Sequence, residues 1–240
     1  MPSPRLDGRD PHAIRPLVFQ RRWLDTVPGS VLVECGLTRV LCTALVEDGV
    51  PPFLKNSDQG WLTAEYSMLP ASTGGRKGRD RAGRTDGRSV EIQRLLGRAL
   101  RAVVDRGGFP GRTIWVDCDV LQADGGTRCA ALNGAYVALH DALTALKSQK
   151  SLSRWPLKDS LQAISVGVVE GETRVDLTYY EDSNAEVDMN LVLTGSGRVI
   201  EINGGAEKQA FTVEQMGSMV EIGQAACADV AAAQQAALGT

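Results

Sequence analysis

The sequence predicts an α+β fold in which mixed or antiparallel sheets are backed by helices. Strand patterns occupy three separate regions, helical patterns lie between and after them, and the chain is large enough for a real core. Its 240 residues are 43% hydrophobic and 23% charged. The strand patterns lie within residues 30–70, 113–120 and 161–203, and the helical patterns lie within 89–104, 127–146 and 212–238.

The first strands are expected to form a hairpin after an extended N-terminal arm. Residues 1–16 are polar and rich in proline and arginine, which predicts the arm. β-Rich runs at 30–35 and 39–46 flank Gly36-Leu37-Thr38, a short turn between two strands. Residues 60–70 form a further strand, which ends at a proline.

A basic loop is predicted between this strand and the first helix. Residues 71–88 hold five glycines, six Lys or Arg and no apolar residue larger than alanine, so nothing in this segment can be buried. We expect a mobile basic loop. The alternative is a solvated insertion without a function.

The helix over 89–104 is expected to have an apolar stripe and a separate basic face. Ser89 is the predicted N-cap, Glu91 lies in the first turn, and Gly107-Gly108 ends the helix. Arg88 stands just before the helix, where it can join the helix dipole in holding an anion. The apolar stripe comprises Ile92, Leu95, Leu96, Ala99, Leu100 and Val103. The basic face comprises Arg94, Arg98 and Arg101.

A glycine-rich turn joins the most regular strand pattern to a buried helix. Residues 113–120 alternate strictly, and residues 129–139 are small or apolar on nearly every side. Between them, Asp124-Gly125-Gly126-Thr127-Arg128 places backbone N–H groups, a hydroxyl and a guanidinium at the positive end of a helix dipole. Proteins hold phosphate in this way. A tight turn with a Thr cap and a solvated Arg is the alternative, and the turn alone does not distinguish the two.

The second half of the chain predicts two pairs of strands and a long C-terminal helix. The strand pairs are 161–169 with 173–179 and 186–194 with 198–203, each joined by a short glycine-containing turn. In the helix over 212–238, the predicted apolar face comprises Val213, Met216, Val220, Ala225 and Cys227.

Charge is concentrated in one part of the chain. Residues 76–106 hold ten Lys or Arg and four acids, a net charge of +6, and the whole chain has a net charge of −3, so the rest must carry −9. An acidic protein with one basic belt indicates a local site for a polyanion rather than general coating of nucleic acid.

Cysteine and histidine usage gives no sign of a metal centre. The five cysteines are an odd number without a CxxC spacing, which predicts reduced and mostly buried thiols of a cytoplasmic protein. His12 and His140 are isolated and are expected to be neither ligands nor bases. The N-terminus lacks the apolar region of a signal peptide, and no run is long enough to span a membrane.

A cluster of acids and amides forms a second candidate site. Residues 180–188 are expected to be a short loop before a strand, and Asp188 shares a sheet face with Glu186 and Asn190. Two carboxylates near a phosphate pocket, here Asp182 and Asp188, suit Mg²⁺-assisted phosphoryl transfer. From spacing alone, an acidic surface loop that keeps the protein soluble is the stronger interpretation.

Three segments together resemble the ribonuclease PH family, bacterial phosphorolytic 3′→5′ exoribonucleases that are related to polynucleotide phosphorylase and the exosome core. They are RSVEIQRLLGR at 88–98, VDCDVLQADGGTR at 116–128 and EDSNAEVDMN at 181–190. The similarity begins at Arg5-Leu-Asp-Gly-Arg9 and continues into the C-terminal helix. It implies one unit over 1–240 with a fold like domain 2 of ribosomal protein S5, assembled as a hexameric ring of dimers.

The resemblance also implies an activity. Such an enzyme is a tRNA nucleotidyltransferase of the cytoplasm: it removes nucleotides from the 3′ tail of precursor tRNA and other structured RNA, uses inorganic phosphate as the attacking group and releases nucleoside diphosphates. By matching position, the residues that bind phosphate are Arg88, Gly126, Thr127 and Arg128. The residues that support catalysis and hold Mg²⁺ are Asp182 and Asp188. The basic loop residues that help to hold tRNA, reaching a neighbouring subunit's site, are Arg76 and Arg79.

Three positions depart from the family's usual pattern. Ala71 follows the Met-Leu-Pro segment where Arg is usual, which removes one tRNA contact. Cys129 follows Arg128 where Thr is usual, a small change of packing. Residues 203–208 read Asn-Gly-Gly-Ala-Glu-Lys instead of Gln-Gly-Thr-Ala-Glu-Gly.

Two other functions compete with this one. A non-catalytic ring subunit of an exosome-like assembly would bind RNA and act as a scaffold, but such relatives typically lose the phosphate arginine or the acids, which are all present here. A small-molecule kinase on the same fold would need a longer glycine–serine loop for ATP, which the sequence does not contain.

Overall fold

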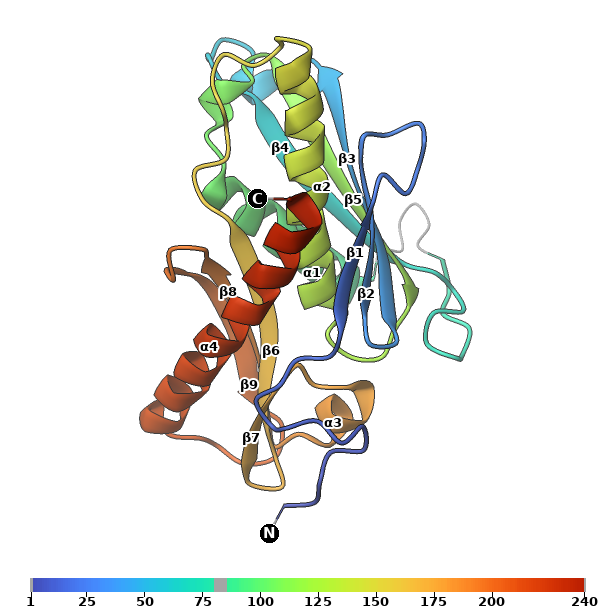
Figure 1. Ribbon diagram of the computed structural model, residues 1–240, viewed down its shortest axis with the longest axis vertical. Helices are drawn as coiled ribbons and strands as arrows, with labels where there is room; N and C mark the ends of the chain where they lie inside the picture. Colours follow the sequence, from blue (N-terminus) through green and yellow to red (C-terminus); the bar gives the residue numbers. More distant parts are fainter. Residues whose placement is uncertain (1, 80–85, 240) are drawn as a thin grey trace.

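The structure is a computed structural model that describes residues 2–79 and 86–239. It contains two sheets, stacked along the long axis of the molecule, with helices packed on them (Figure 1). The five-stranded sheet has the order β1 (Leu17–Arg21), β2 (Gly29–Cys35), β3 (Thr38–Asp48), β5 (Arg112–Gln122) and β4 (Trp61–Met68). The four-stranded sheet has the order β7 (Glu172–Val175), β6 (Leu161–Val169), β8 (Val187–Thr194) and β9 (Val199–Ala206).

Four α-helices and two short 3-10 helices occur in the described part of the chain. The α-helices are α1 (Gly87–Val103), α2 (Thr127–Ser148), α3 (Tyr179–Asn184) and α4 (Val213–Leu238), and the 3-10 helices are Pro52–Leu54 and Arg106–Gly108. β4 runs parallel to β5, whereas all other paired strands are antiparallel. The predicted α+β class with mixed and antiparallel sheets is therefore confirmed.

α2 lies between the two sheets and forms the centre of the core. It packs on β2 and β3 of the first sheet and on β6 of the second, so side chains on nearly every face of its first four turns are buried. At Gly134, a Cβ atom would lie 2.7 Å from the Cys42 sulfur, so the helix can approach β3 this closely only with glycine at that position. The predicted helix with small or apolar residues on all sides is confirmed.

α1 covers β4 with the predicted apolar stripe, all six residues of which are buried. Its predicted ends are wrong. The helix begins at Gly87 with Asp86 as N-cap, so Ser89 lies inside the first turn, where its hydroxyl donates to Asp86 Oδ2 at 3.2 Å. Glu91 lies beyond the first turn, and α1 ends at Val103, before the 3-10 helix that contains Gly107 and Gly108.

The second sheet is covered by α4, whose apolar face differs from the prediction. The first turns of α4 extend past the sheet (Figure 1), which leaves the side chains of Val213 and Met216 75% and 37% exposed. The buried face lies further along the helix and comprises Met219, Gly223, Ala226, Cys227, Val230 and Gln234. The helix starts as predicted, since Thr212 and Gln215 form a capping box.

Two predictions for residues 173–188 need correction. The strand expected to reach residue 179 ends at Val175, and the expected acidic loop contains the helix α3. Thr178 and Glu181 form a capping box that starts this helix, so side-chain hydrogen bonds replace the loop conformation.

The N-terminal arm has no helix or strand before β1, as predicted, but it is packed against the protein rather than solvated. Arg5 and Arg15 are buried and form ion pairs with Glu181 and Asp176, respectively. All five cysteines are free thiols and four of them are buried, as predicted for these side chains. No helix in the described ranges is long and apolar enough to cross a membrane.

Candidate active site

The turn between β5 and α2 has the geometry of an anion-binding loop. Gly125 and Gly126 adopt φ angles of +71° and +63°, a left-handed conformation that glycine allows without strain. Gly126 is the N-cap of α2 and makes no side-chain capping bond. The first intrahelical bond runs from Ala130 N to Gly126 O at 2.9 Å, so the amides of Thr127, Arg128 and Cys129 precede it and are available as donors.

The hydroxyl of Thr127 completes this set of donors. The Tyr66 hydroxyl donates to Thr127 Oγ1 at 3.0 Å, and burial, above all, raises the pKa of Tyr66, so this phenol stays protonated. Because Thr127 accepts from Tyr66, its own proton is directed elsewhere and can be donated to a bound anion. The alternative of a Thr cap is therefore wrong: Thr127 is the first residue of the helix and its hydroxyl bonds Tyr66.

Arg128 is held in place rather than solvated. Its Nη1 and Nη2 donate to Glu91 Oε1 and Oε2 at 3.2 and 3.5 Å, and its side chain is 14% exposed. Asn203 Nδ2 on β9 also donates to Glu91 Oε1, at 2.8 Å. The start of α2 is thus tied to the first half of α1 through Glu91.

Arg88 lies in the first turn of α1 and brings a second cation close to the same place. Burial raises the pKa values of the Tyr66 hydroxyl and of the Asp182 and Asp188 carboxyl groups. The positive charges of Arg88 and Arg128 act on all three groups and oppose that rise. Two arginines from the N-terminal turns of two helices therefore converge on one region. The sequence predicted that Arg88 lies just before the helix. It lies in the first turn of α1 instead, which is still at the positive end of the helix dipole.

Asp182 on α3 and Asp188 on β8 form the acidic side of this region. Burial raises the pKa of both carboxyl groups above the ordinary value, and the charge of Asp182 raises that of Asp188 further. Glu207 raises both as well, while the two arginines oppose the shifts. Neither carboxylate has a hydrogen-bond partner among the described residues, so a divalent cation would relieve this repulsion.

The protein can supply only part of a metal coordination shell here. In the described part of the chain there is no group of three or more His, Cys, Asp or Glu side chains that could hold a metal ion. Two carboxylates with water and substrate phosphate oxygens as the remaining ligands is a common arrangement for Mg²⁺. Asp182 and Asp188 therefore fit this ion.

Several residues at the site were not predicted. Tyr66 bonds Thr127, and Glu91 bonds Arg128. Asn203 bonds Glu91, and the charge of Glu207 acts on Asp182 and Asp188. Asn203 and Glu207 fall in the 203–208 segment that departs from the family pattern, and the structure explains the position of that segment. It runs along β9 beside the site, where Asn203 bonds Glu91 and Lys208 Nζ donates to Asn184 O at 2.6 Å.

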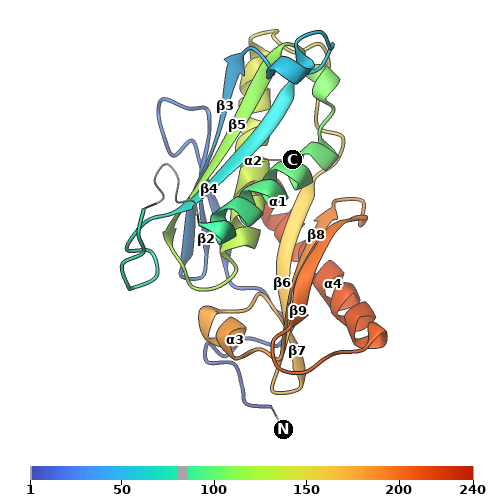
Figure 2. The same cartoon turned by 180° about the vertical axis from the view of Figure 1, so that it is seen from behind.

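Arg76 and Arg79 do not join this constellation within one subunit. They lie in the loop after β4, both are exposed, and the loop projects from the end of the first sheet (Figure 2). Of the predicted basic loop 71–88, the stretch 80–85, with Arg81 and Arg84, lies outside the described residues, and residues 87–88 belong to α1.

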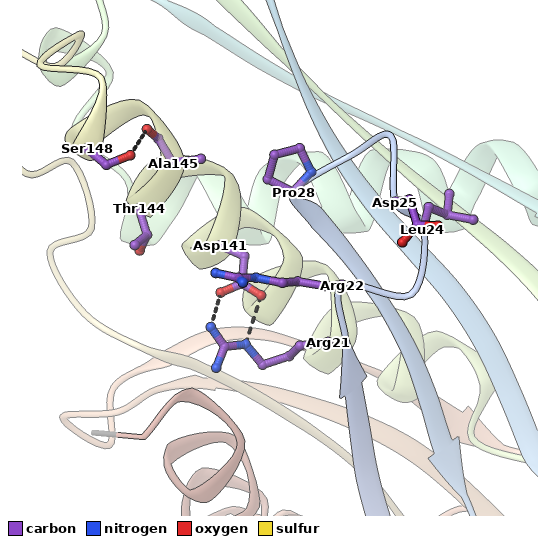
Figure 3. Close-up of a pocket in the computed structure, with 9 residues that line it drawn as sticks. All are labelled: Arg21, Arg22, Leu24, Asp25, Pro28, Asp141, Thr144, Ala145 and Ser148. Carbon is purple, nitrogen blue, oxygen red and sulfur yellow. Dashed lines mark hydrogen bonds and ion pairs between the residues drawn. The ribbon is translucent and has the colours of Figure 1, made fainter.

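A cavity of about 500 Å³ lies elsewhere, at the far end of α2 from the phosphate turn. The loop after β1 and the second half of α2 line it, and Figure 3 shows Arg21 bound to Asp141 at its base. It contains none of the residues that the sequence marked as functional. We therefore place the candidate active site at the turn.

A turn with free amide donors, two arginines and two carboxyl groups at one place suits a class of protein: an enzyme that acts on phosphate-bearing substrates. Comparison with known proteins agrees. The model of the 3′ exoribonuclease family, domain 1, matches residues 13–144, and that of domain 2 matches residues 160–226. Ribonuclease PH of Moorella thermoacetica is 50% identical over 236 residues, which cover 98% of this chain and 94% of that protein.

Solved structures share the fold. Rice (Oryza sativa) Rrp46 superposes with a TM-score of 0.80 at 24% identity, covering 98% of this chain and 100% of its own. The Archaeoglobus fulgidus exosome with RNA bound to the active site has a chain that matches with a TM-score of 0.80 at 18% identity, covering 95% of this chain and 91% of its own. This chain belongs to the 3′ exoribonuclease family typified by ribonuclease PH. It is a phosphate-dependent 3′→5′ exoribonuclease.

Proposed function

We propose that Arg88 and the turn Gly126-Thr127-Arg128 hold inorganic phosphate as the nucleophile of this reaction. Asp182 and Asp188 hold Mg²⁺ beside it, and the 3′-terminal phosphodiester of RNA lies between the two groups. The observation that carries this proposal is the convergence of two arginines, from the N-terminal turns of α1 and α2, on two carboxyl groups with raised pKa values.

The reaction requires two anions to approach each other, and the site is built to offset their repulsion. Arg88, Arg128 and the amides of the first turn of α2 neutralise and orient the phosphate. The Thr127 hydroxyl, fixed by Tyr66, donates to one of its oxygens. Bound Mg²⁺ would stabilise charge on the scissile phosphate and on the departing oxygen. No nucleophilic side chain is needed, since the attacking group is the bound phosphate itself.

The products follow from this arrangement. A phosphate oxygen attacks the phosphorus of the terminal nucleotide, and the bond from that phosphorus to the 3′ oxygen of the preceding nucleotide breaks. The terminal nucleotide leaves as a nucleoside diphosphate. The departing 3′ oxygen takes up a proton, and the carboxyl group of Asp182 or Asp188 would act as the general acid that supplies it.

The RNA is the 3′ tail of precursor tRNA, bound by a ring of six subunits that forms from dimers. Arg76 and Arg79 are exposed on a loop that projects from the end of the first sheet (Figure 2), which supports a contact with RNA at a neighbouring subunit's site. Five free thiols support a reducing compartment, the cytoplasm.

The test measures the products released from an RNA with a short 3′ tail. With Mg²⁺ and phosphate, the protein is expected to release nucleoside diphosphates. Omitting phosphate or chelating the metal should each abolish activity. Release of nucleoside monophosphates without phosphate would overturn the proposal.

The alternative that the sequence raised is a non-catalytic RNA-binding ring subunit, and the solved structures with this fold include chains of exosomes. The intact set of Arg88, Arg128, Asp182 and Asp188 favours the enzyme. RNA binding without any turnover, under conditions that fold the ring, would favour the scaffold.

A further inference from the structure

A buried ion pair, Arg15 with Asp176, lies beneath the proposed phosphate turn. Arg15 Nε and Nη2 donate to Asp176 Oδ2 and Oδ1 at 2.9 and 2.7 Å, and the Arg15 backbone amide donates to Asp176 Oδ2 at 2.7 Å. The two side chains are 4% and 6% exposed. The pair joins the N-terminal arm to the segment between β7 and α3, 161 residues further along the chain.

Arg15 also contacts two segments that lead into the candidate active site, the turn before α2 and the segment before α3. Its Nη1 donates to the backbone carbonyl of Asp124 at 2.5 Å, in the turn that leads to Gly126. Its Nη2 donates to the carbonyl of Leu177 at 3.4 Å, immediately before α3. One guanidinium therefore holds the phosphate turn and the start of the helix that carries Asp182 at a fixed separation.

The turn and α3 are also in direct contact with each other. A Cβ atom on Gly125 would lie 2.7 Å from Tyr179 N, so only glycine allows this approach. Tyr179 N in turn donates to Asp124 Oδ1 at 3.3 Å. The turn and the first residue of α3 are therefore packed without space between them.

The backbone at Asp176 is shaped for this role. Asp176 has a φ angle of +51°, which is uncommon for a residue with a side chain. Its amide donates to Ser165 O at 2.7 Å, and the next amide, of Leu177, donates to Ser165 Oγ at 3.0 Å. These bonds to β6 fix an unfavourable backbone conformation that directs the carboxylate towards Arg15.

A second buried pair extends the same connection to the residue next to Asp182. Arg5 Nε and Nη2 donate to Glu181 Oε1 and Oε2, both at 2.8 Å, and Arg174 Nη1 donates to Oε1 at 3.3 Å. Glu181 also closes the capping box that starts α3. The N-terminal arm therefore contacts α3 at two points: Arg15 bonds Leu177, just before the helix, and Arg5 bonds Glu181 in its first turn.

We propose that Arg15 and Asp176 are positioning residues, which set the distance between the phosphate turn and the helix that carries Asp182. Neither touches substrate. The proposal rests on the proposed function, because it assumes that the turn holds phosphate. A lysine at position 15 keeps the charge but cannot bond Asp176, Asp124 and Leu177 together, since it lacks the planar fork of donors.

The chain offers a matched control in Arg21 and Asp141, which Figure 3 shows. Arg21 Nε and Nη2 donate to Asp141 Oδ2 and Oδ1 at 2.8 and 2.5 Å, and Asp141 is 4% exposed. Like the first pair, it joins the N-terminal part of the chain to a distant element. It links the end of β1 to the second half of α2, far from the turn. Arg21→Lys should therefore reduce stability without moving the turn.

The experiment compares wild type, Arg15→Lys, Asp176→Asn and Arg21→Lys by two readouts. The first is hydrogen exchange of the 124–130 and 177–182 segments without ligands, and the second is the phosphate KM with kcat. We expect both segments to exchange faster in Arg15→Lys and Asp176→Asn, with phosphate KM raised about 5- to 20-fold and kcat changed less. Arg21→Lys should change both readouts less than 2-fold. KM remains readable if part of a variant fails to fold, because it does not depend on enzyme concentration.

The outcomes separate this inference from the proposed function. Unchanged exchange in both segments, or the same change in Arg21→Lys, would overturn the positioning role. If both segments exchange faster but the phosphate KM is unchanged, Arg15 and Asp176 do hold the turn and α3 together. The proposal that the turn binds phosphate would then be wrong.

Discussion

Arg128 donates to both carboxylate oxygens of Glu91, at 3.2 and 3.5 Å. This pair links α1 and α2 beside the place where we propose that phosphate binds. Glu91 orients the guanidinium, and Asn203 Nδ2 donates to Glu91 Oε1 at 2.8 Å. The side chain of Arg128 is thus set in direction before any ligand arrives, which reduces the entropy lost on binding.

Glu91→Ala is expected to raise the phosphate KM about 3- to 10-fold, because Arg128 loses the partner that orients it, while Arg88 and the amides of α2 remain. Steady-state kinetics at varied phosphate measures this. Glu201→Ala is the control, since Glu201 binds Arg98 on the same helix but away from the site. A lower KM in Glu91→Ala would show that Glu91 competes with phosphate instead of orienting Arg128.

Arg88→Ala is expected to reduce kcat/KM for phosphate by about 10²-fold or more, as is typical when one charged donor is removed from a transition state. Binding of RNA should change little, because RNA makes its main contacts elsewhere. Arg94→Ala, which removes an exposed arginine from the same helix, is the control. Equal losses in the two variants would mean that only the general charge of α1 matters.

Asp182→Asn and Asp188→Asn are expected to abolish activity and yet stabilise the metal-free protein at neutral pH. Burial and repulsion disfavour both ionised carboxylates, so their removal should raise the free energy of unfolding. For a chain of this size, each added kcal/mol corresponds to a rise of roughly 2–4 °C in Tm. Thermal unfolding with and without Mg²⁺ measures it. Mg²⁺ should stabilise only wild type, and a variant that is less stable than metal-free wild type contradicts the account.

The same pKa shifts set a pH dependence with a definite sign. The folded-state pKa of each carboxyl group lies above its ordinary value of 3.8. The stability that the protonated carboxyl groups contribute is therefore fully present below about pH 4. It is lost as the pH rises through the folded-state pKa. We expect the stability advantage of Asp188→Asn over metal-free wild type to be absent at the acidic end and to grow towards neutral pH. An advantage that shrinks with rising pH would contradict the assignment.

Arg76→Ala with Arg79→Ala is expected to raise the KM for tRNA about 10-fold and to reduce its salt dependence, because two phosphate contacts are lost. The phosphate KM should not change. Lys150→Ala, which removes a cation from the end of α2, is the control. An unchanged tRNA KM in the double variant would exclude the loop from RNA binding.

Much of this fold could be predicted because local patterns and packing agree. The alternation over residues 113–120 survives in β5 because α2 covers only one face of its sheet, and the apolar α2 fits a position between two sheets. The glycines at 125 and 126 were sufficient to predict a turn between the strand and the helix. The residue types of Arg88, Arg128, Asp182 and Asp188 indicated phosphate and metal chemistry once the family resemblance put them together.

Other features depended on partners far away in the sequence. Arg5 and Arg15 in a polar segment look solvated, and only Glu181 and Asp176, more than 160 residues away, make their burial favourable. The apolar face of α4 was misplaced because the end of the sheet beneath it, rather than helical spacing, decides which turns are covered. Helix α3 did carry a signal, since Thr178 and Glu181 have the spacing of a capping box.

The most direct test of the central claim follows the phosphate itself. Wild type is incubated with Mg²⁺, a 3′-tailed RNA and isotopically labelled inorganic phosphate, and the released nucleotides are separated and analysed. If the turn at Gly126–Arg128 and Arg88 hold the nucleophile, the label appears in the β-phosphate of nucleoside diphosphates, and Arg88→Ala abolishes its incorporation. Unlabelled nucleoside monophosphates, formed at the same rate with or without phosphate, would contradict the account.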